Sequence, residues 1–168
     1  MKRTTNADPD LARLAVRVGS SLLRSGRSAA TAESCTGGWI AKALTDIAGS
    51  SQWFLEGFVT YSNAAKVRSL GVPKSALNAH GAVSEAVARA MAWGALRRSG
   101  AHVAVAVTGI AGPDGATPGK PVGTVWLAWA VRHGAKVRVT ADLKRFRGDR
   151  EAVRRKTVRA AMIGILQR

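Results

Sequence analysis

The segment that most constrains the fold is Ala101–Val107, an apolar run in which β-branched valine recurs. A strand of this kind is typical of the centre of a sheet whose two faces are both covered. Helical and strand patterns surround it in the order α-β-α-β-α-α-β-β-β-α, which predicts an α/β layered fold with a mixed sheet. The expected helices are Leu11–Arg24, Trp39–Ile47, Asn63–Leu70, Glu85 to about Arg98, and Asp149–Leu166, and the expected strands are Ser28–Glu33, Phe54–Tyr61, Ala101–Val107, Val122–Val131 and Lys136–Lys144.

The chain length of 168 residues and a hydrophobic content of 46% predict one domain, spanning residues 11–168. Residues 1–10 are polar and are expected to be disordered, with Asp10 as the N-cap of the first helix. The single cysteine, Cys35, excludes an intramolecular disulfide and a multi-cysteine zinc site. No signal-peptide core and no apolar segment of membrane-spanning length are present, so we expect a cytoplasmic protein without a membrane partner.

The net charge of +16, from 26 basic and 10 acidic residues, leaves three classes of partner open. These are nucleic acid, an anionic membrane surface and a small anionic substrate. Between Val131 and Arg168 twelve basic residues face only three acidic ones. Aromatic residues, 5% of the chain, are not interleaved with this basic run, which argues against a single-strand stacking platform. The net charge still leaves a nucleic-acid-binding module without catalysis as the alternative to an enzyme.

The first candidate for chemistry is Glu33-Ser34-Cys35-Thr36-Gly37-Gly38, where a strand is followed by a helix. Free N–H groups at a helix N-terminus carry partial positive charge. A serine there can attack a carbonyl carbon while the backbone amides of Cys35, Thr36, Gly37 and Gly38 hold the oxyanion. Two alternatives stay open: Ser34 is only a helix cap, or Cys35 is the nucleophile, since thiols are intrinsically the better nucleophiles.

A base for this serine is predicted in Tyr61-Ser62-Asn63-Ala64-Ala65-Lys66. The three histidines occupy a turn, a strand start and a hairpin, and the sequence has no Gly-x-Ser-x-Gly motif. Lys66 lies one turn into a predicted helix, so it can reach the end of the sheet where Ser34 lies. A partly desolvated lysine has a lowered pKa and can act as a general base, with the Tyr61 hydroxyl as proton relay. The alternative is an ordinary surface lysine.

Two further segments predict contacts to a phosphate. The loop Thr108–Pro121 is rich in glycine, including Gly109 and Gly112, and follows the buried strand, but it has neither Walker A spacing nor a following helix. In the last predicted helix, which Asp149 caps, Arg150 and Arg154 are four residues apart and so share one face. Together with Arg147 they are candidate phosphate ligands, and the alternative is a solvated basic face.

The ordered set of motifs resembles the CinA C-terminal domain family over roughly Leu11–Leu166. The motifs are Ala32-Glu33-Ser34-Cys35-Thr36-Gly37-Gly38, Tyr61-Ser62-Asn63-x-x-Lys66, Gly81-Ala82-Val83-Ser84, Thr108-Gly109-Ile110-Ala111-Gly112-Pro113-x-Gly115, Lys120-Pro121-Val122-Gly123-x-Val125 and Phe146-x-Gly148-Asp149-Arg150. Phe58 stands where the family commonly has a glycine, and we expect it to narrow the substrate pocket.

The resemblance implies a three-layer α/β/α sandwich with a mixed central sheet. It implies hydrolysis of nicotinamide mononucleotide (NMN) to nicotinate mononucleotide and ammonia, as in the stand-alone amidohydrolases of pyridine-nucleotide salvage. By the same resemblance Ser34 is the nucleophile, Lys66 the base and Tyr61 the assisting residue, and Thr108 lies near the reacting amide. It also implies no metal or organic cofactor, no specific nucleic-acid partner and a homo-oligomer, dimeric or larger.

Overall fold

The computed structural model describes residues 8–168, in which five strands form one mixed sheet in the order β2-β1-β3-β4-β5. The strands are β1 (Ala29–Glu33), β2 (Phe54–Val59), β3 (Val103–Gly109), β4 (Thr124–His133) and β5 (Lys136–Arg145). Strand β1 lies between β2 and β3 and is parallel to both, whereas β3 pairs with β4 and β4 with β5 in antiparallel fashion. The parallel strands β1 and β2 therefore end at the same edge of the sheet, where the predicted Ser34 and Lys66 segments follow them.

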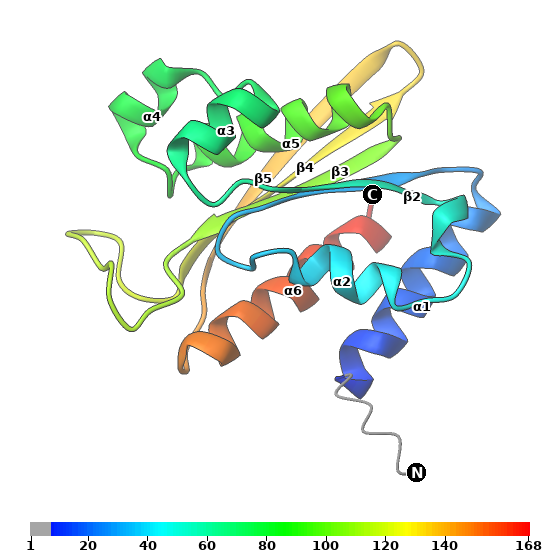
Figure 1. The fold of residues 1–168 in the computed structure, drawn as a ribbon, viewed down its shortest axis with the longest axis horizontal. Helices are drawn as coiled ribbons and strands as arrows, with labels where there is room; N and C mark the ends of the chain where they lie inside the picture. The colour runs from blue at the N-terminus through cyan, green and yellow to red at the C-terminus, as the bar shows by residue number, and fades with distance from the viewer. Residues whose placement is uncertain (1–7) are drawn as a thin grey trace.

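Helices cover both faces of the sheet, as Figure 1 shows: α1, α2 and α6 lie on one side, and α3, α4 and α5 on the other. The helices are α1 (Pro9–Arg24), α2 (Trp39–Thr45), α3 (Asn63–Leu70), α4 (Lys74–His80), α5 (Glu85–Ser99) and α6 (Arg150–Leu166), with a short 3-10 turn, η1 (Ser50–Gln52). The predicted three-layer sandwich with a mixed sheet is confirmed. Among residues 8–168, no helix has the length and hydrophobicity that a membrane crossing requires.

The two faces of the sheet carry side chains of different size. Because strand residues alternate between faces, the valines of β3 pack towards α1 and α6, and the alanines between them pack towards α5. Small side chains on that face allow helices to pack close to the sheet and to one another. The contact of α5 with α3 is so close that a Cβ on Gly94 would lie 2.0 Å from the Leu70 carbonyl oxygen. This packing holds α3, which carries Lys66, in a fixed position over the sheet edge.

Two details differ from the predicted elements. Helix α1 begins at Pro9 and its N-cap is Asp8, whose side chain accepts from the Asp10 and Leu11 amides, so Asp10 is not the cap. The predicted disordered segment 1–10 is thus ordered at its last residues, and residues 1–7 lie outside the described part. Helix α4 was not predicted, since it is two turns long, has no side-chain cap and buries only Leu77.

Candidate active site

Ser34 and Lys66 meet at the carboxyl end of the parallel strands. Ser34 directly follows β1, and its amide donates to the Val107 carbonyl of β3 at 3.1 Å. Lys66 reaches down from α3, and its Nζ lies 3.1 Å from Ser34 Oγ and 2.8 Å from the Thr60 carbonyl oxygen. The two side chains predicted to act together are therefore in hydrogen-bond contact.

Lys66 is buried, with 1% of its surface exposed, so it is not the surface lysine of the alternative prediction. No carboxylate pairs with it among the described residues; its hydrogen bonds go to neutral oxygens. Desolvation by burial lowers the pKa of Lys66, because removing water disfavours the charged ammonium. A lysine in this environment has a larger neutral fraction at moderate pH and can accept the Ser34 proton.

The Glu33 side chain hydrogen-bonds the turn after Ser34 and the first residues of α2. This role was not predicted from the sequence. Its side chain is 1% exposed. The carboxylate accepts hydrogen bonds from Thr36 Oγ1 at 2.6 Å and from the amides of Gly38, Ile40 and Ala41 at 3.1, 3.0 and 2.8 Å. The N-terminus of α2 is therefore already occupied by an internal anion. The sequence signal that could have indicated this role is an acidic residue at the end of a strand that is otherwise apolar or small.

The paired glycines give this turn its shape. Gly37 and Gly38 have φ angles of +63° and +95°, in the left-handed region that other residues avoid. A Cβ on Gly38 would also lie 3.2 Å from Cγ2 of Val59 on the neighbouring strand. Backbone conformation and close packing thus both favour glycine at these positions. The two glycines form the tight turn that connects Ser34 to the start of α2.

Of the four backbone amides predicted to bind the oxyanion, two are already hydrogen-bonded within residues 8–168 and two are free there. The Gly37 amide donates to the Ser34 carbonyl at 3.0 Å, and the Gly38 amide donates to Glu33, so neither is free for a substrate. The amides of Cys35 and Thr36 donate to no other residue in the described part of the chain. The Gly37 and Gly38 amides are therefore engaged within the turn, and the oxyanion prediction stays a prediction, with Cys35 and Thr36 as its free amides.

The Cys35 side chain points into the core and does not share the position of Ser34. Its surface is 6% exposed, and it packs in the cluster beneath the sheet. Burial raises the pKa of the Cys35 thiol to about 12, so at neutral pH the reactive thiolate is scarce. The geometry favours Ser34 over Cys35 as nucleophile, and Cys35 contributes its backbone to the turn.

Tyr61 is exposed and contacts Lys66 only through its backbone. Its carbonyl oxygen lies 3.4 Å from Lys66 Nζ, whereas its hydroxyl accepts a hydrogen bond from Arg150 Nη2 at 3.0 Å. Arg150 also donates from Nη1 to the Gly112 carbonyl at 2.7 Å. The predicted relay through the Tyr61 hydroxyl is thus absent from this geometry, and the phenol instead contacts Arg150, which joins the start of α6 to the loop before β4.

The remaining predicted residues at that end of the sheet, Thr108, Gly109 and Gly112, make packing contacts, and their roles at the substrate stay predictions. Thr108 is 1% exposed and its hydroxyl donates to the Ala82 carbonyl at 2.9 Å, which ties β3 to the segment before α5. A Cβ on Gly109 would lie 2.7 Å from Cγ2 of Val125, and one on Gly112 would lie 2.6 Å from Cγ1 of Val122. The valine side chains packed against the two glycine Cα atoms leave no room for a Cβ, which explains both glycines.

Arg154 is the predicted phosphate ligand whose position differs most from expectation. Its Nε donates to the Cys35 carbonyl at 3.1 Å and its Nη2 to the Thr36 carbonyl at 2.8 Å. The guanidinium also lies over the Trp39 ring, 5.3 Å from its centroid. Arg154 is thus engaged by the nucleophile turn, and Arg147, by contrast, is exposed before α6.

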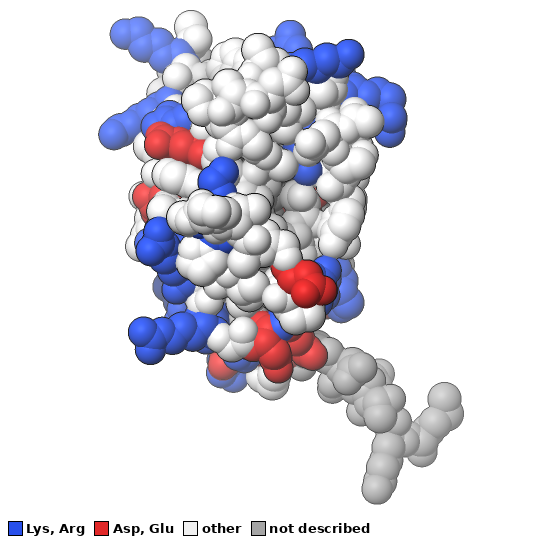
Figure 2. Space-filling model, turned by 90° about the vertical axis from the view of Figure 1, so that its left-hand side faces the viewer, with Lys and Arg blue, Asp and Glu red and all other residues white. Residues whose placement is uncertain are grey.

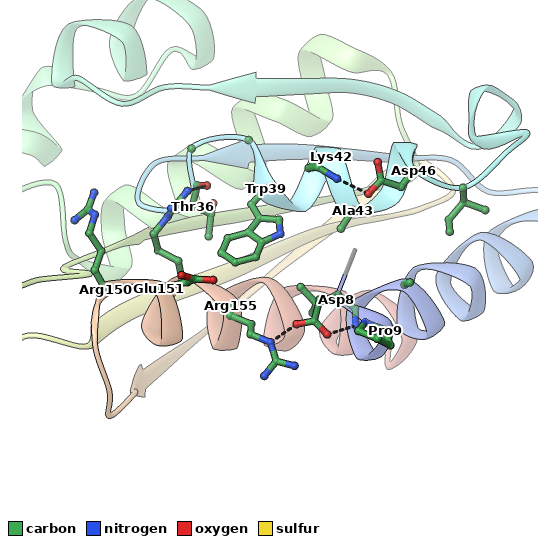
Figure 3. A pocket seen from close by; sticks show the side chains of 16 residues that line it. Asp8, Pro9, Thr36, Trp39, Lys42, Ala43, Asp46, Arg150, Glu151 and Arg155 are labelled. Atoms are coloured by element: carbon green, nitrogen blue, oxygen red, sulfur yellow. Dashed lines mark hydrogen bonds and ion pairs between the residues drawn. The ribbon is translucent and has the colours of Figure 1, made fainter. Parts of the chain in front are cut away.

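A groove of about 1310 Å³ lies beside the turn, between α1, α2 and α6 (Figure 3). Thr36, Gly37 and Gly38 form part of its wall, but neither Ser34 nor Lys66 lines it. Ion pairs of Arg155 with Asp8 and of Lys42 with Asp46 lie along it. The groove lies on the face of the sheet that α1, α2 and α6 cover, whereas Lys66 comes from α3 on the other face (Figure 1).

The end of the molecule that carries α4, the loop before β4 and the start of α6 faces the viewer in Figure 2. Its centre is largely uncharged, and Lys and Arg side chains lie mainly around its border. The high net charge does not form one continuous basic surface on this face. That distribution gives no support here to the nucleic-acid alternative, which needs a clustered basic footprint.

The fold is an α/β sandwich in which a serine follows one parallel strand and a buried lysine lies on the helix after the next strand. This is the arrangement expected of an amide hydrolase with a serine nucleophile and a lysine base. The chain belongs to the CinA C-terminal domain family, which residues 11–168 match. It is 57% identical over 154 residues to nicotinamide-nucleotide amidohydrolase PncC of Pseudomonas putida, covering 92% of this chain and 94% of that one. The Escherichia coli K12 protein of the same name is 52% identical, with 92% of each chain covered.

Solved structures agree with this assignment. The competence/damage inducible protein CihA from Agrobacterium tumefaciens has a TM-score of 0.90 and 46% identity, with 98% of each chain covered. A CinA superfamily protein from Klebsiella pneumoniae has a TM-score of 0.87 and 41% identity, covering 92% of this chain and 94% of that one. The family resemblance predicted from the motifs is confirmed.

Phe58, which was expected to narrow the substrate pocket, lies half-buried on β2, on the face of the sheet that α3 and α5 cover. It is paired with Ala32 of β1 and packs against the buried cluster under α5, among alanines of the sheet and Leu70 of α3. Phe58 therefore packs on the same face as Lys66, and its effect on the substrate pocket stays a prediction.

Proposed function

We propose that this chain hydrolyses the carboxamide of NMN to nicotinate mononucleotide and ammonia, with Ser34 as nucleophile and Lys66 as general base. The observation that carries the proposal is the 3.1 Å contact between Lys66 Nζ and Ser34 Oγ at a buried sheet edge. The amidohydrolase relatives support the reaction class, since the similarity extends over 92% of this chain.

The first half of the reaction forms an acyl-enzyme. Neutral Lys66 takes the proton of the Ser34 hydroxyl while Oγ attacks the carboxamide carbon. The carbonyl oxygen becomes an oxyanion, for which the free amides of Cys35 and Thr36 are the available donors. Lys66, now an ammonium, returns its proton to the amide nitrogen, the C–N bond breaks and ammonia leaves.

The second half releases the product. Neutral Lys66 takes a proton from a water molecule, whose oxygen attacks the ester carbon on Ser34. The ester C–O bond then breaks, Ser34 regains a proton from Lys66, and nicotinate mononucleotide departs. The balance is one water consumed and one ammonia released for each amide cleaved.

We assign the substrate phosphate to the start of α6, where Arg147 and Arg150 are exposed basic residues. Arg150 connects this helix end to Tyr61, whose carbonyl in turn contacts Lys66. A dianionic phosphate bound there gains charge-assisted hydrogen bonds that a nucleoside without phosphate lacks.

An ammonia-release assay with NMN, nicotinamide riboside, nicotinamide and NAD tests this function. We expect the highest kcat/KM with NMN and a loss of at least about tenfold with the riboside, which corresponds to about 1.4 kcal/mol of phosphate binding. Absence of ammonia release from every one of these carboxamides would contradict the proposal, and equal rates with NMN and the riboside would contradict the phosphate assignment.

We further propose that the chain is a homo-oligomer in the cytoplasm. Edge strand β2 exposes Leu55 and Val59 and has only one charged residue, Glu56, whereas the opposite edge β5 carries four basic residues and one acidic residue. Charges protect an edge from pairing, so β2 is the edge suited to pair with a second copy. Light scattering after size exclusion tests this, and a monomeric mass would contradict it.

The proposed cytoplasmic location is consistent with the free thiol of Cys35, since thiols stay reduced in a reducing compartment.

A further inference from the structure

Arg154 connects α6 to the two peptide groups that follow the nucleophile. Both contacts are to carbonyl oxygens, those of Cys35 and Thr36, and they come from different nitrogens of one planar guanidinium. The stacking on Trp39 restrains the guanidinium further. A rigid, forked donor of this kind fixes the orientation of its acceptors as well as their position.

The orientation of the Cys35 carbonyl determines where the Thr36 amide points. In a planar trans peptide the C=O and N–H bonds point in opposite directions, and the only cis bond among the described residues is Gly112–Pro113. Because the Cys35 carbonyl faces Arg154 on α6, the Thr36 N–H is directed away from α6. Helices α6 and α3 lie on opposite faces of the sheet, so this N–H points towards the side from which Lys66 approaches Ser34.

We propose that Arg154 is a positioning residue that holds the Thr36 amide in the orientation needed to bind the oxyanion. The inference rests on the proposed Ser34 mechanism and replaces the phosphate-binding role predicted for Arg154 from the sequence. Glu33 restrains the same turn from its other end, through Thr36 Oγ1 and the Gly38 amide. The buried Glu33 carboxylate and the partly buried Arg154 guanidinium thereby fix one short turn between them, which limits the reorganisation needed when negative charge develops.

Kinetics of Arg154→Ala and Arg154→Lys test the proposal, with Arg155→Ala as the matched control. Arg155 is the next residue of α6, carries the same charge, and forms ion pairs with Asp8 and Asp10 instead of contacting the turn. We expect kcat of Arg154→Ala to fall about 10- to 100-fold, the effect of a misplaced catalytic group, with KM changed by less than about threefold. Arg155→Ala should keep wild-type kcat.

A comparison of substrates separates positioning from phosphate binding. If Arg154 acts on the oxyanion, its loss reduces kcat/KM for NMN and for nicotinamide riboside by the same factor. A selective loss with NMN, or a raised KM with unchanged kcat, would overturn the proposal. Arg154→Lys retains the charge but not the fork, so we expect it to lose most of the kcat that Arg154→Ala loses; full kcat in Arg154→Lys would also overturn it.

Two controls keep this test independent of folding and of the proposed function. Thermal unfolding identifies any variant whose native state is lost, and kinetics are compared at a temperature where each variant is folded. Wild-type activity that persists in Ser34→Ala would refute the Ser34 mechanism itself. Activity that disappears in Ser34→Ala but is unaffected in Arg154→Ala would refute the positioning role alone.

Discussion

The side-chain nitrogen of Lys66 lies 3.1 Å from the hydroxyl oxygen of Ser34, although the two residues are 32 positions apart in the chain. Parallel pairing of β1 with β2 produces this contact, since Glu33 is aligned with Val59 and both strands end at one edge of the sheet. The buried alanines under α5 then let α3 pack close enough for Lys66 to reach the serine. The tertiary packing therefore creates both the contact and the desolvation that lowers the lysine pKa.

Lys66 is predicted to control the pH dependence of the reaction. The neutral amine is the active form, so kcat/KM falls as pH falls through the Lys66 pKa in the free enzyme. Because burial lowers this pKa, the acid limb should lie below the ordinary lysine value of about 10.4. Lys66→Arg, which stays protonated, should be inactive at every pH tested. An acid limb at or above the ordinary value, or an active Lys66→Arg, would refute Lys66 as base.

The same lysine is predicted to make folding stability rise with pH. Its pKa is lower in the folded state than in the unfolded state. At pH values between these two pKa values the unfolded chain binds more protons than the folded one, so the free energy of unfolding increases with pH in this range. The stability difference between Lys66→Met and wild type should therefore move in favour of wild type as pH rises through this window. Urea unfolding at several pH values measures it, and a pH-independent difference would contradict the desolvated state of Lys66.

Cys35→Ala is predicted to keep wild-type kcat, because the thiol is buried and its pKa is raised to about 12. The cost should appear in stability, at roughly 1 kcal/mol for a small buried side chain. Ammonia release and urea unfolding measure the two effects. A Cys35→Ala protein that is folded and inactive would indicate that the thiol, and not Ser34, carries the acyl group.

Glu33→Gln is predicted to destabilise the fold by roughly 3 kcal/mol and to lower kcat. The amide nitrogen of glutamine is a donor, and it would face backbone N–H groups that the carboxylate now accepts. Glu56→Gln is the matched control, because Glu56 is exposed on β2 and its loss should change stability by less than about 0.5 kcal/mol. Equal unfolding free energies of the two variants would contradict the structural role of Glu33.

Gly38→Ala is predicted to cost more stability than Gly26→Ala. Both glycines have positive φ, +95° and +62°, so both substitutions carry backbone strain of about 1 kcal/mol. Only Gly38 would also place a Cβ 3.2 Å from Val59, and nothing lies within 4 Å of a Cβ on Gly26. Gly38→Ala should in addition reduce kcat, since the turn after Ser34 moves. Identical losses of stability with unchanged kcat would show that the turn tolerates a side chain.

The strands and most helices were predictable because their periodicity and caps are local. Asp149 caps α6 as expected and Ser84 caps α5; their side chains accept hydrogen bonds from the Ala152 and Val87 amides. Helix α4 was not predicted because its short sequence has one buried residue and no side-chain cap. The first turn of α1 was misplaced because Asp8 and Asp10 are both suitable caps, and only the backbone conformation distinguishes them.

In the site, the pairing of Ser34 with Lys66 was predictable from strand ends, but hydrogen-bond partners were not. Arg150 and Arg154 lie on one helix face, as the spacing predicts. Which oxygen each guanidinium contacts depends on the packing of α6 against the turn and the loop before β4. Glu33 was missed because its role requires the N-terminus of α2 to lie beneath the end of β1, which only the folded chain defines.

The most direct test of the mechanism is the rate of ammonia release from NMN by Ser34→Ala. Removal of a nucleophile typically costs several orders of magnitude, so we predict a fall in kcat of at least about 10³-fold with an unfolding midpoint close to that of wild type. Wild-type ammonia release by folded Ser34→Ala would contradict the central claim.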